Sequence, residues 1–179
     1  MFRPFALALA LAAAPLAAQP LVRTADGVLA GKAERGVEAY LGVPYAAPPT
    51  GALRWKAPVD PDIWNDTKPT TKFANACVQY GRIYGPGANN AYDATIATTL
   101  NQAVGSEDCL YLNIWRPATD EGKLPVVVFI HGGSNVSGYT ADPVYDGATL
   151  AKTANAVVVT ANYRLGIFRA REAVATPDR

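Results

Sequence analysis

The chain has 179 residues, of which 50% are hydrophobic and 17% charged, and its 15 Gly and 14 Pro follow no repeat. These proportions exclude a fibrous or intrinsically disordered chain and fit one globular domain. The 16 Lys and Arg residues almost balance the 15 Asp and Glu residues, for a net charge of +1. We therefore find no electrostatic reason to expect nucleic acid or an anionic membrane surface as a partner.

Residues 1–18 have the layout of a secretory signal peptide. Arg3 gives a basic start, residues 6–14 form an Ala/Leu-rich run, and small residues lead to Ala18. We expect cleavage after Ala18, which leaves Gln19 as the first residue of the mature chain. Pro15 and Gln19 interrupt the run before it reaches the ~20 apolar residues of a transmembrane anchor. The sequence thus predicts export to the periplasm or the extracellular space, with no stable membrane anchor.

The first part of the mature chain is rich in turn signals. Asp26-Gly27 separates two short strand-like runs and predicts an N-terminal hairpin. Residues 42–61 contain too many Pro and Gly for a helix and predict an ordered surface loop that Trp55 and Trp64 anchor by packing. Residues 81–106 are polar, and we expect a short helix over residues 91–104.

Three later stretches predict strands of an α/β sheet. Residues 110–115 alternate, which indicates a strand with one buried face. Residues 125–130 and 156–161 are continuous apolar, β-branched runs, typical of strands covered on both faces. Between these two runs, residues 147–154 predict a helix that Asp146 caps. A strand, a helix and a second strand in this order form a right-handed βαβ unit with parallel strands.

Export affects how the two cysteines, Cys77 and Cys109, are interpreted. An oxidising compartment permits a disulfide, and two cysteines allow a single intramolecular pairing. The alternative is a pair of separate buried thiols. With His131 as the only histidine, the sequence contains no cluster of zinc-type ligands, and we expect neither a metal nor another cofactor.

A glycine pair follows the predicted strand at residues 126–130. The segment His131-Gly132-Gly133-Ser134 lies at the carboxyl end of that strand, where open α/β sheets bind their ligands. Successive glycines allow backbone N–H groups to converge on an anionic oxygen, as in an oxyanion hole. The same residues would also suit a plain tight turn.

Four segments together point to a family. They read YLGVPYAAPPTGALRWKAP at 40–58, SEDCLYLNIW at 106–115, FIHGGSN at 129–135 and NYRLGIF at 162–168. In this order they resemble the N-terminal part of a type-B carboxylesterase, the family of the cholinesterases and para-nitrobenzyl esterases. The string EDCLYLN is the most specific of these motifs. The resemblance extends from about residue 22 to residue 168.

The resemblance implies an α/β-hydrolase fold, of which this chain would form the N-terminal portion with the first strands of a central mixed sheet. It also implies hydrolysis of small-molecule carboxylic esters by a Ser nucleophile, a His base and a Glu or Asp. Gly133 and Ser134 then become the expected N–H donors of the oxyanion hole, with Gly132 shaping the turn. Many relatives have Gly where this chain has Ser134, and we expect that difference to alter the acyl or alcohol preference.

The resemblance assigns scaffold roles to two further pairs. Arg54 and Glu107 match a buried salt bridge that ties the N-terminal loop to the disulfide region. Cys77 matches the disulfide partner of Cys109. Neither pair takes part in the chemistry.

The catalytic nucleophile is absent from these residues. The fold holds it in a Gly-x-Ser-x-Gly elbow, and neither Ser106, Ser134 nor Ser137 lies in one. A local triad of Ser134, His131 and Asp142 is unfavourable, because a base must reach its nucleophile and its orienting acid on opposite ring nitrogens. We therefore expect the chain alone to lack a complete active site.

Residues 169–179 are charged and unlike the family, as a frameshifted or prematurely ended reading frame would produce. We accordingly divide the chain into a signal peptide (1–18), the N-terminal part of an α/β-hydrolase domain (19–168) and a non-family tail (169–179). The resulting hypothesis is an inactive fragment of a secreted esterase. The alternative is a secreted, non-catalytic binding module that holds an anionic ligand on the same glycine loop.

Overall fold

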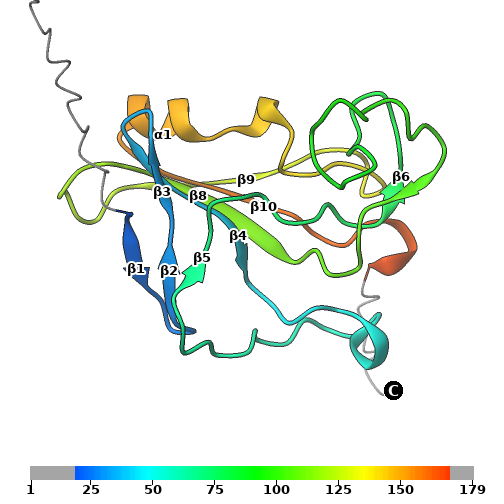
Figure 1. Ribbon diagram of the computed structural model, residues 1–179, viewed down its shortest axis with the longest axis horizontal. Coiled ribbons are helices and arrows are strands. Elements are labelled where there is room, and N and C mark those ends of the chain that lie inside the picture. Colours follow the sequence, from blue (N-terminus) through cyan, green and yellow to red (C-terminus); the bar gives the residue numbers. More distant parts are fainter. Residues whose placement is uncertain (1–18, 170–179) are drawn as a thin grey trace, which may run out of the picture.

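A five-stranded mixed sheet forms the centre of the computed structural model, which describes residues 19–169 (Figure 1). The predicted signal peptide lies outside the described residues, as does the predicted tail except for Arg169. The order in the central sheet is β3-β4-β8-β10-β9, and β1-β2-β5 and β6-β7 form two smaller sheets. The strands are β1 (Leu21–Arg23), β2 (Val28–Ala30), β3 (Lys32–Glu34), β4 (Val37–Pro44), β5 (Lys68–Pro69), β6 (Gln79–Tyr80), β7 (Ala103–Val104), β8 (Tyr111–Pro117), β9 (Val126–Ile130) and β10 (Val157–Ala161). The helices are α1 (Ala148–Ala154) and the 3-10 turns Gly51–Leu53, Pro143–Tyr145 and Gly166–Phe168.

The predicted βαβ unit is present as β9, α1 and β10, with β9 and β10 parallel. Antiparallel pairing of β10 with β8 makes the sheet mixed. The Asp146 carboxylate accepts the Ala148 N–H at 2.9 Å, although the position next to the helix is occupied by Gly147. Helix α1 packs on one face of the sheet through a buried cluster comprising Val37, Ala39, Leu41, Trp115, Ala148, Ala151 and Val158.

The predicted hairpin covers part of the sheet's other face. Strands β1 and β2 pair antiparallel around the turn at Gly27. Leu29 of β2 is fully buried against Tyr40 and Val43 of β4. Trp64 packs beside this cluster and donates its indole N–H to the Val28 carbonyl at 3.0 Å, as its predicted anchoring role requires.

Two predictions about residues 42–61 need correction. The segment begins inside β4, which continues to Pro44 despite its Gly and Pro. Strand β4 tolerates Gly42, with φ +70°, because its register against β8 shifts between Tyr40 and Val43. Trp55 is 54% exposed and is held by one hydrogen bond to the Ile167 carbonyl, so it does not anchor the loop by packing.

The helix predicted over residues 91–104 is wrong, because this segment consists of turns followed by β7. Side chains compete there for the backbone: Asp93 accepts the Thr95 N–H at 2.8 Å, and Thr95 accepts the Ala88 N–H at 2.7 Å. Ala97 and Asn101 adopt left-handed conformations, with φ of 64° and 60°. Local side-chain bonds and left-handed residues both end a helix before it can propagate.

The prediction that both apolar strands are covered on two faces fails for β9. Its five residues are 40–61% exposed, because β9 is the outermost strand of the sheet in residues 19–169. Strand β10 instead lies between β8 and β9, and Val158 is 2% exposed. The apolar edge of this chain is therefore β9. Within the same residues, no helix is long and apolar enough to cross a membrane.

An exposed apolar edge strand predicts self-association of the chain. Val128→Lys, at the centre of β9, is expected to reduce aggregation without changing the circular dichroism spectrum, because the lysine remains in water. The matched variant Val158→Lys should unfold the chain, because it buries a charge. Light scattering and circular dichroism check both. Equal aggregation of Val128→Lys and the parent chain would contradict this account of the edge.

Candidate functional site: an oxyanion loop

The loop that follows β9, residues 131–138, contains the predicted oxyanion residues and is called here the oxyanion loop. Its turn depends on Gly133, which has φ +120° and whose added Cβ would lie 1.9 Å from the Ser137 carbonyl oxygen. Ser134 and Asn135 continue in the left-handed region, with φ of 56° and 60°. Any side chain at position 133 would therefore displace the turn.

Three successive carbonyls of the loop are held by hydrogen bonds. The Tyr163 hydroxyl donates to the His131 carbonyl at 2.6 Å. The His131 ring Nδ1 lies 3.0 Å from the Gly132 carbonyl oxygen. The Gly133 carbonyl accepts the N–H groups of Val136 and Ser137 at 3.0 and 3.2 Å. The planes of the peptides 131–132, 132–133 and 133–134 are thereby fixed.

The N–H groups of the same three peptides are free. Within residues 19–169, neither Gly132, Gly133 nor Ser134 donates its N–H to a protein acceptor. These three peptides are trans, so each N–H points opposite to the bound carbonyl of the same peptide. Consecutive free N–H groups in a left-handed turn form a site for an anionic oxygen.

Gly132 and Gly133 lie on the wall of an open depression of ≈ 820 Å³. The first part of the segment between the cysteines, residues 79–85, forms another part of that wall, and Tyr139 and Tyr145 contribute aromatic surface. Arg82 and Asp142 are the charged residues of the lining. Ser134 is not among the lining residues, although the structure places it next to Gly133 in the same turn.

Gln79 attaches the oxyanion loop to the disulfide region. Its side-chain amide donates to the Gly138 carbonyl and accepts the Gly138 N–H, both at 2.9 Å. Gln79 is 5% exposed and also donates to the Cys77 carbonyl at 3.1 Å. A side chain added at Gly138 would meet His131 Nδ1 at 2.3 Å, so this glycine lets the ring lie against the loop.

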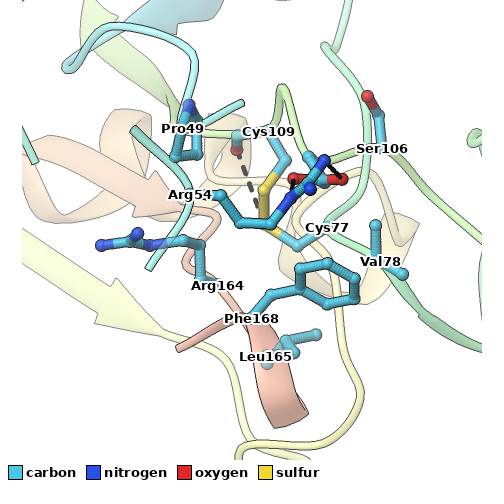
Figure 2. Close-up of a pocket in the computed structure, with 10 residues that line it drawn as sticks. Pro49, Arg54, Cys77, Val78, Ser106, Cys109, Arg164, Leu165 and Phe168 are labelled. Atoms are coloured by element: carbon cyan, nitrogen blue, oxygen red, sulfur yellow. Dashed lines mark hydrogen bonds and ion pairs between the residues drawn. A yellow bond between two sulfur atoms is a disulfide. The ribbon is translucent and has the colours of Figure 1, made fainter. Parts of the chain in front are cut away.

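The predicted disulfide joins Cys77 and Cys109, and both cysteines are buried. Beside it, Arg54 donates to both carboxylate oxygens of Glu107, with Nη2 2.7 Å from Oε1 (Figure 2). The Glu107 hydrogen bonds raise the pKa of the Arg54 guanidinium. The predicted ion pair is therefore present. The two side chains are 39% and 22% exposed, so the expectation that the pair is buried is wrong.

A second set of buried polar groups fixes Thr140, two positions beyond the end of the loop. The Asn162 side chain accepts the Thr140 N–H at 2.9 Å and donates to the Asn75 carbonyl at 3.0 Å. Asn113 donates to the hydroxyls of Thr140 and Thr160. Buried polar side chains whose bonds are made in this way specify one arrangement of the segments that they join.

The local triad considered from the sequence does not form. His131 is 3% exposed, and its Nε2 has no hydrogen-bond partner in the structure. Asp142 instead accepts the Val144 N–H at 3.0 Å. Burial lowers the pKa of His131 and outweighs the Gly132 carbonyl, which raises it. Residues 19–169 also contain no group of three or more His, Cys, Asp or Glu that could hold a metal ion.

The sequence matches the Carboxylesterase family over residues 18–169. The chain belongs to this family. It is 39% identical to the para-nitrobenzyl esterase of Bacillus subtilis (strain 168), over 83% of this chain and 28% of that protein. It is 42% identical to the fumonisin B1 esterase of Sphingopyxis macrogoltabida, over 87% of this chain and 27% of that protein.

A solved PNB esterase structure superposes with a TM-score of 0.72 and 40% identity, covering 84% of this chain and 29% of that one. The fold is accordingly the N-terminal portion of an α/β-hydrolase, as predicted. The chain spans 27–28% of the length of the two esterases named above. These carboxylesterase relatives are therefore more than three times as long as the matched segment.

Three side chains that hold the loop were missed at the sequence level: Gln79, Tyr163 and the ring of His131. Gln79 and Tyr163 reach the loop from segments 59 and 32 positions away. No local pattern signals such contacts. The one available hint was that the chain's single histidine directly precedes the glycine pair.

Replacing Gln79 should destabilise the chain, because the half-buried Gly138 backbone would lose the side chain that binds both its N–H and its carbonyl. We expect Gln79→Leu to lower the free energy of unfolding by about 1–3 kcal/mol. The control Gln102→Leu changes an exposed side chain and should cost less than about 0.5 kcal/mol. Urea unfolding followed by fluorescence measures both. Equal losses would show that Gln79 does not clamp the loop.

Proposed function

We propose that this chain supplies the oxyanion-binding part of a carboxylic-ester hydrolase that acts on small-molecule esters. The observation that carries the proposal is the row of three free N–H groups at Gly132, Gly133 and Ser134. The carbonyl of each of these three peptides is fixed by a hydrogen bond. Membership of the carboxylesterase family supports the same chemistry.

During ester hydrolysis, attack on the substrate carbonyl converts its oxygen into an oxyanion. The N–H groups of Gly133 and Ser134 donate to that oxygen, and Gly132 gives the turn its shape. Because the peptide planes are already fixed, the donors need no reorganisation when the charge develops. Removing one such donor from an oxyanion hole costs roughly 10²–10³ in kcat. The acyl or alcohol group of the ester occupies the depression beside the loop.

The nucleophile, acid and base must come from outside these residues. The sequence contains no Gly-x-Ser-x-Gly elbow, and its single histidine is buried behind the loop. We therefore expect the 179-residue chain, tested alone, to show no enzymatic turnover of para-nitrophenyl acetate. A loop that binds carboxylates without turnover is the second candidate, since the same free N–H groups suit it.

A chimera tests the proposal. Residues 19–168 would replace the matching part of the Bacillus subtilis para-nitrobenzyl esterase, which shares 39% identity with this chain. The chimera should hydrolyse para-nitrophenyl acetate, and Gly133→Pro within it should lower kcat by at least about 10²–10³, because one N–H is lost and because proline cannot adopt the φ of +120° that the turn requires at position 133. Steady-state kinetics measure both effects.

The matched control for that chimera is Gly122→Pro, in a loop where an added Cβ would meet no atom within 4 Å. This variant should retain the chimera's kcat. A folded chimera without esterase activity would contradict the proposed function, and so would full activity in Gly133→Pro. Carboxylate binding together with an inactive chimera would favour the binding module.

We also propose export through the predicted signal peptide at residues 1–18. The Cys77–Cys109 disulfide supports this proposal, because such bonds persist in oxidising compartments. In natively exported, unreduced protein that is unfolded in guanidinium chloride to expose both side chains, both cysteines should resist alkylation by iodoacetamide, as read by mass spectrometry. After reduction both should react, which serves as the control. Alkylation of both cysteines without reduction would refute the exported, bridged state.

A further inference from the structure

His131 lies directly behind the donors of the oxyanion loop, and its two ring nitrogens have different surroundings. Nδ1 lies 3.0 Å from the Gly132 carbonyl oxygen. Nε2 is buried and has no partner. The ring stacks on Tyr163, with centroids 4.4 Å apart and planes 17° apart. The Tyr163 hydroxyl also bonds the His131 carbonyl, so backbone and ring of His131 are both held by one residue.

These surroundings select one protonation state of the ring. A proton on Nδ1 makes a hydrogen bond to the Gly132 carbonyl, whereas a bare Nδ1 would set two lone pairs against each other. A proton on Nε2 would leave a buried donor without an acceptor, which is the costlier kind of unpaired group. The favoured form is therefore the neutral ring with its proton on Nδ1.

We infer that His131, as the neutral Nδ1–H imidazole, is the positioning residue that aims the Gly133 N–H at the oxyanion by holding the Gly132 carbonyl. The ring acts on the Gly133 N–H through the trans peptide 132–133. Because the ring holds the Gly132 carbonyl, the Gly133 N–H of the same peptide must point in the opposite direction. The inference deepens the proposed function, because it concerns the aim of a donor assigned there.

Protonation of the neutral ring leaves the Nδ1–H bond to the Gly132 carbonyl in place and adds its proton at the other nitrogen. It places a charged N–H at Nε2, where the structure offers no acceptor. Tyr163 is the titratable group stacked on the ring, and no charged side chain contributes to the shift of the His131 pKa, which burial lowers. The unfolded chain then takes up a proton that the folded chain excludes. The contribution of the neutral His131 ring to the free energy of unfolding is fully present above the pKa of histidine in the unfolded chain, about 6.5. This contribution is lost as the pH falls below that value.

The single histidine makes the test unambiguous, because every imidazole signal of the ¹⁵N-labelled chain belongs to His131. Two-dimensional NMR of the ring nitrogens should show a protonated Nδ1 and a bare Nε2 at neutral pH. The titration midpoint should lie below about 6.5, the value of an unperturbed histidine. The Gly133 amide signal should shift with the same midpoint. A proton on Nε2, a midpoint at or above about 6.5, or a Gly133 amide that does not titrate would each overturn the inference.

Variants separate positioning from packing. His131→Asn retains a side-chain amide that can donate to the Gly132 carbonyl, so its Gly133 signal should stay close to the parent's and no longer titrate. His131→Leu should displace that signal at every pH. Tyr163→Phe keeps the stacked ring but loses the bond to the His131 carbonyl, and should move Gly132 more than Gly133.

Identical Gly133 signals in His131→Leu and the parent chain would contradict the inference, even if both fold. None of these measurements depends on ester turnover. If the NMR measurements contradict the inference, the proposed function is still tested by the chimera. If the chimera is inactive, the tautomer and the titration of His131 are still tested by NMR.

Discussion

A trans peptide cannot turn its carbonyl without turning its N–H, and this constraint governs the end of β9. The carbonyls of His131, Gly132 and Gly133 are bound to Tyr163, to the His131 ring and to the N–H groups of Val136 and Ser137. The N–H groups of the same three peptides, at Gly132, Gly133 and Ser134, have no protein acceptor in the described residues. Donor direction is thus set before a ligand arrives, which is the condition under which an oxyanion site is effective.

The rest of the structure supplies the groups that hold those carbonyls and the ends of the loop. Tyr163 and Asn162 directly follow β10, the central partner of β9. Gln79 begins β6, two residues after the disulfide cysteine Cys77, and binds both polar atoms of the Gly138 backbone. The disulfide therefore lies next to one of the supports of the loop. Sites built on such rigid supports keep their geometry better than isolated loops.

Local pattern predicted much of this fold. The apolar, β-branched runs predicted β9 and β10, the alternating pattern predicted β8, and the Asp26-Gly27 turn predicted the hairpin. The exposed faces of β9 were not predictable, because a strand's composition does not state which neighbours cover it. The helix expected over residues 91–104 failed because Asp93 and Thr95 bind nearby backbone groups, a choice that helix propensity does not describe.

The candidate site, like the fold, was predictable from the sequence only in part. The glycine pair after β9 identified the loop, since positive φ and close approach at Gly133 require glycine. Its supports could not be derived, because Gln79 and Tyr163 are brought to the loop by the fold and not by spacing. The partial exposure of the Arg54–Glu107 pair was also beyond the sequence, since a motif names two partners without stating how much of their surface is covered.

Amide hydrogen exchange across the oxyanion loop tests the central claim most directly, because it reads each N–H separately. We expect rapid exchange at Gly132, Gly133 and Ser134, whose N–H groups have no protein acceptor within residues 19–169. Exchange should be several-fold slower at Val136, Ser137 and Gly138, whose N–H groups are bonded to Gly133 and Gln79. Protection of Gly133 and Ser134, or rapid exchange throughout residues 132–138, would contradict a loop with fixed carbonyls and free donors.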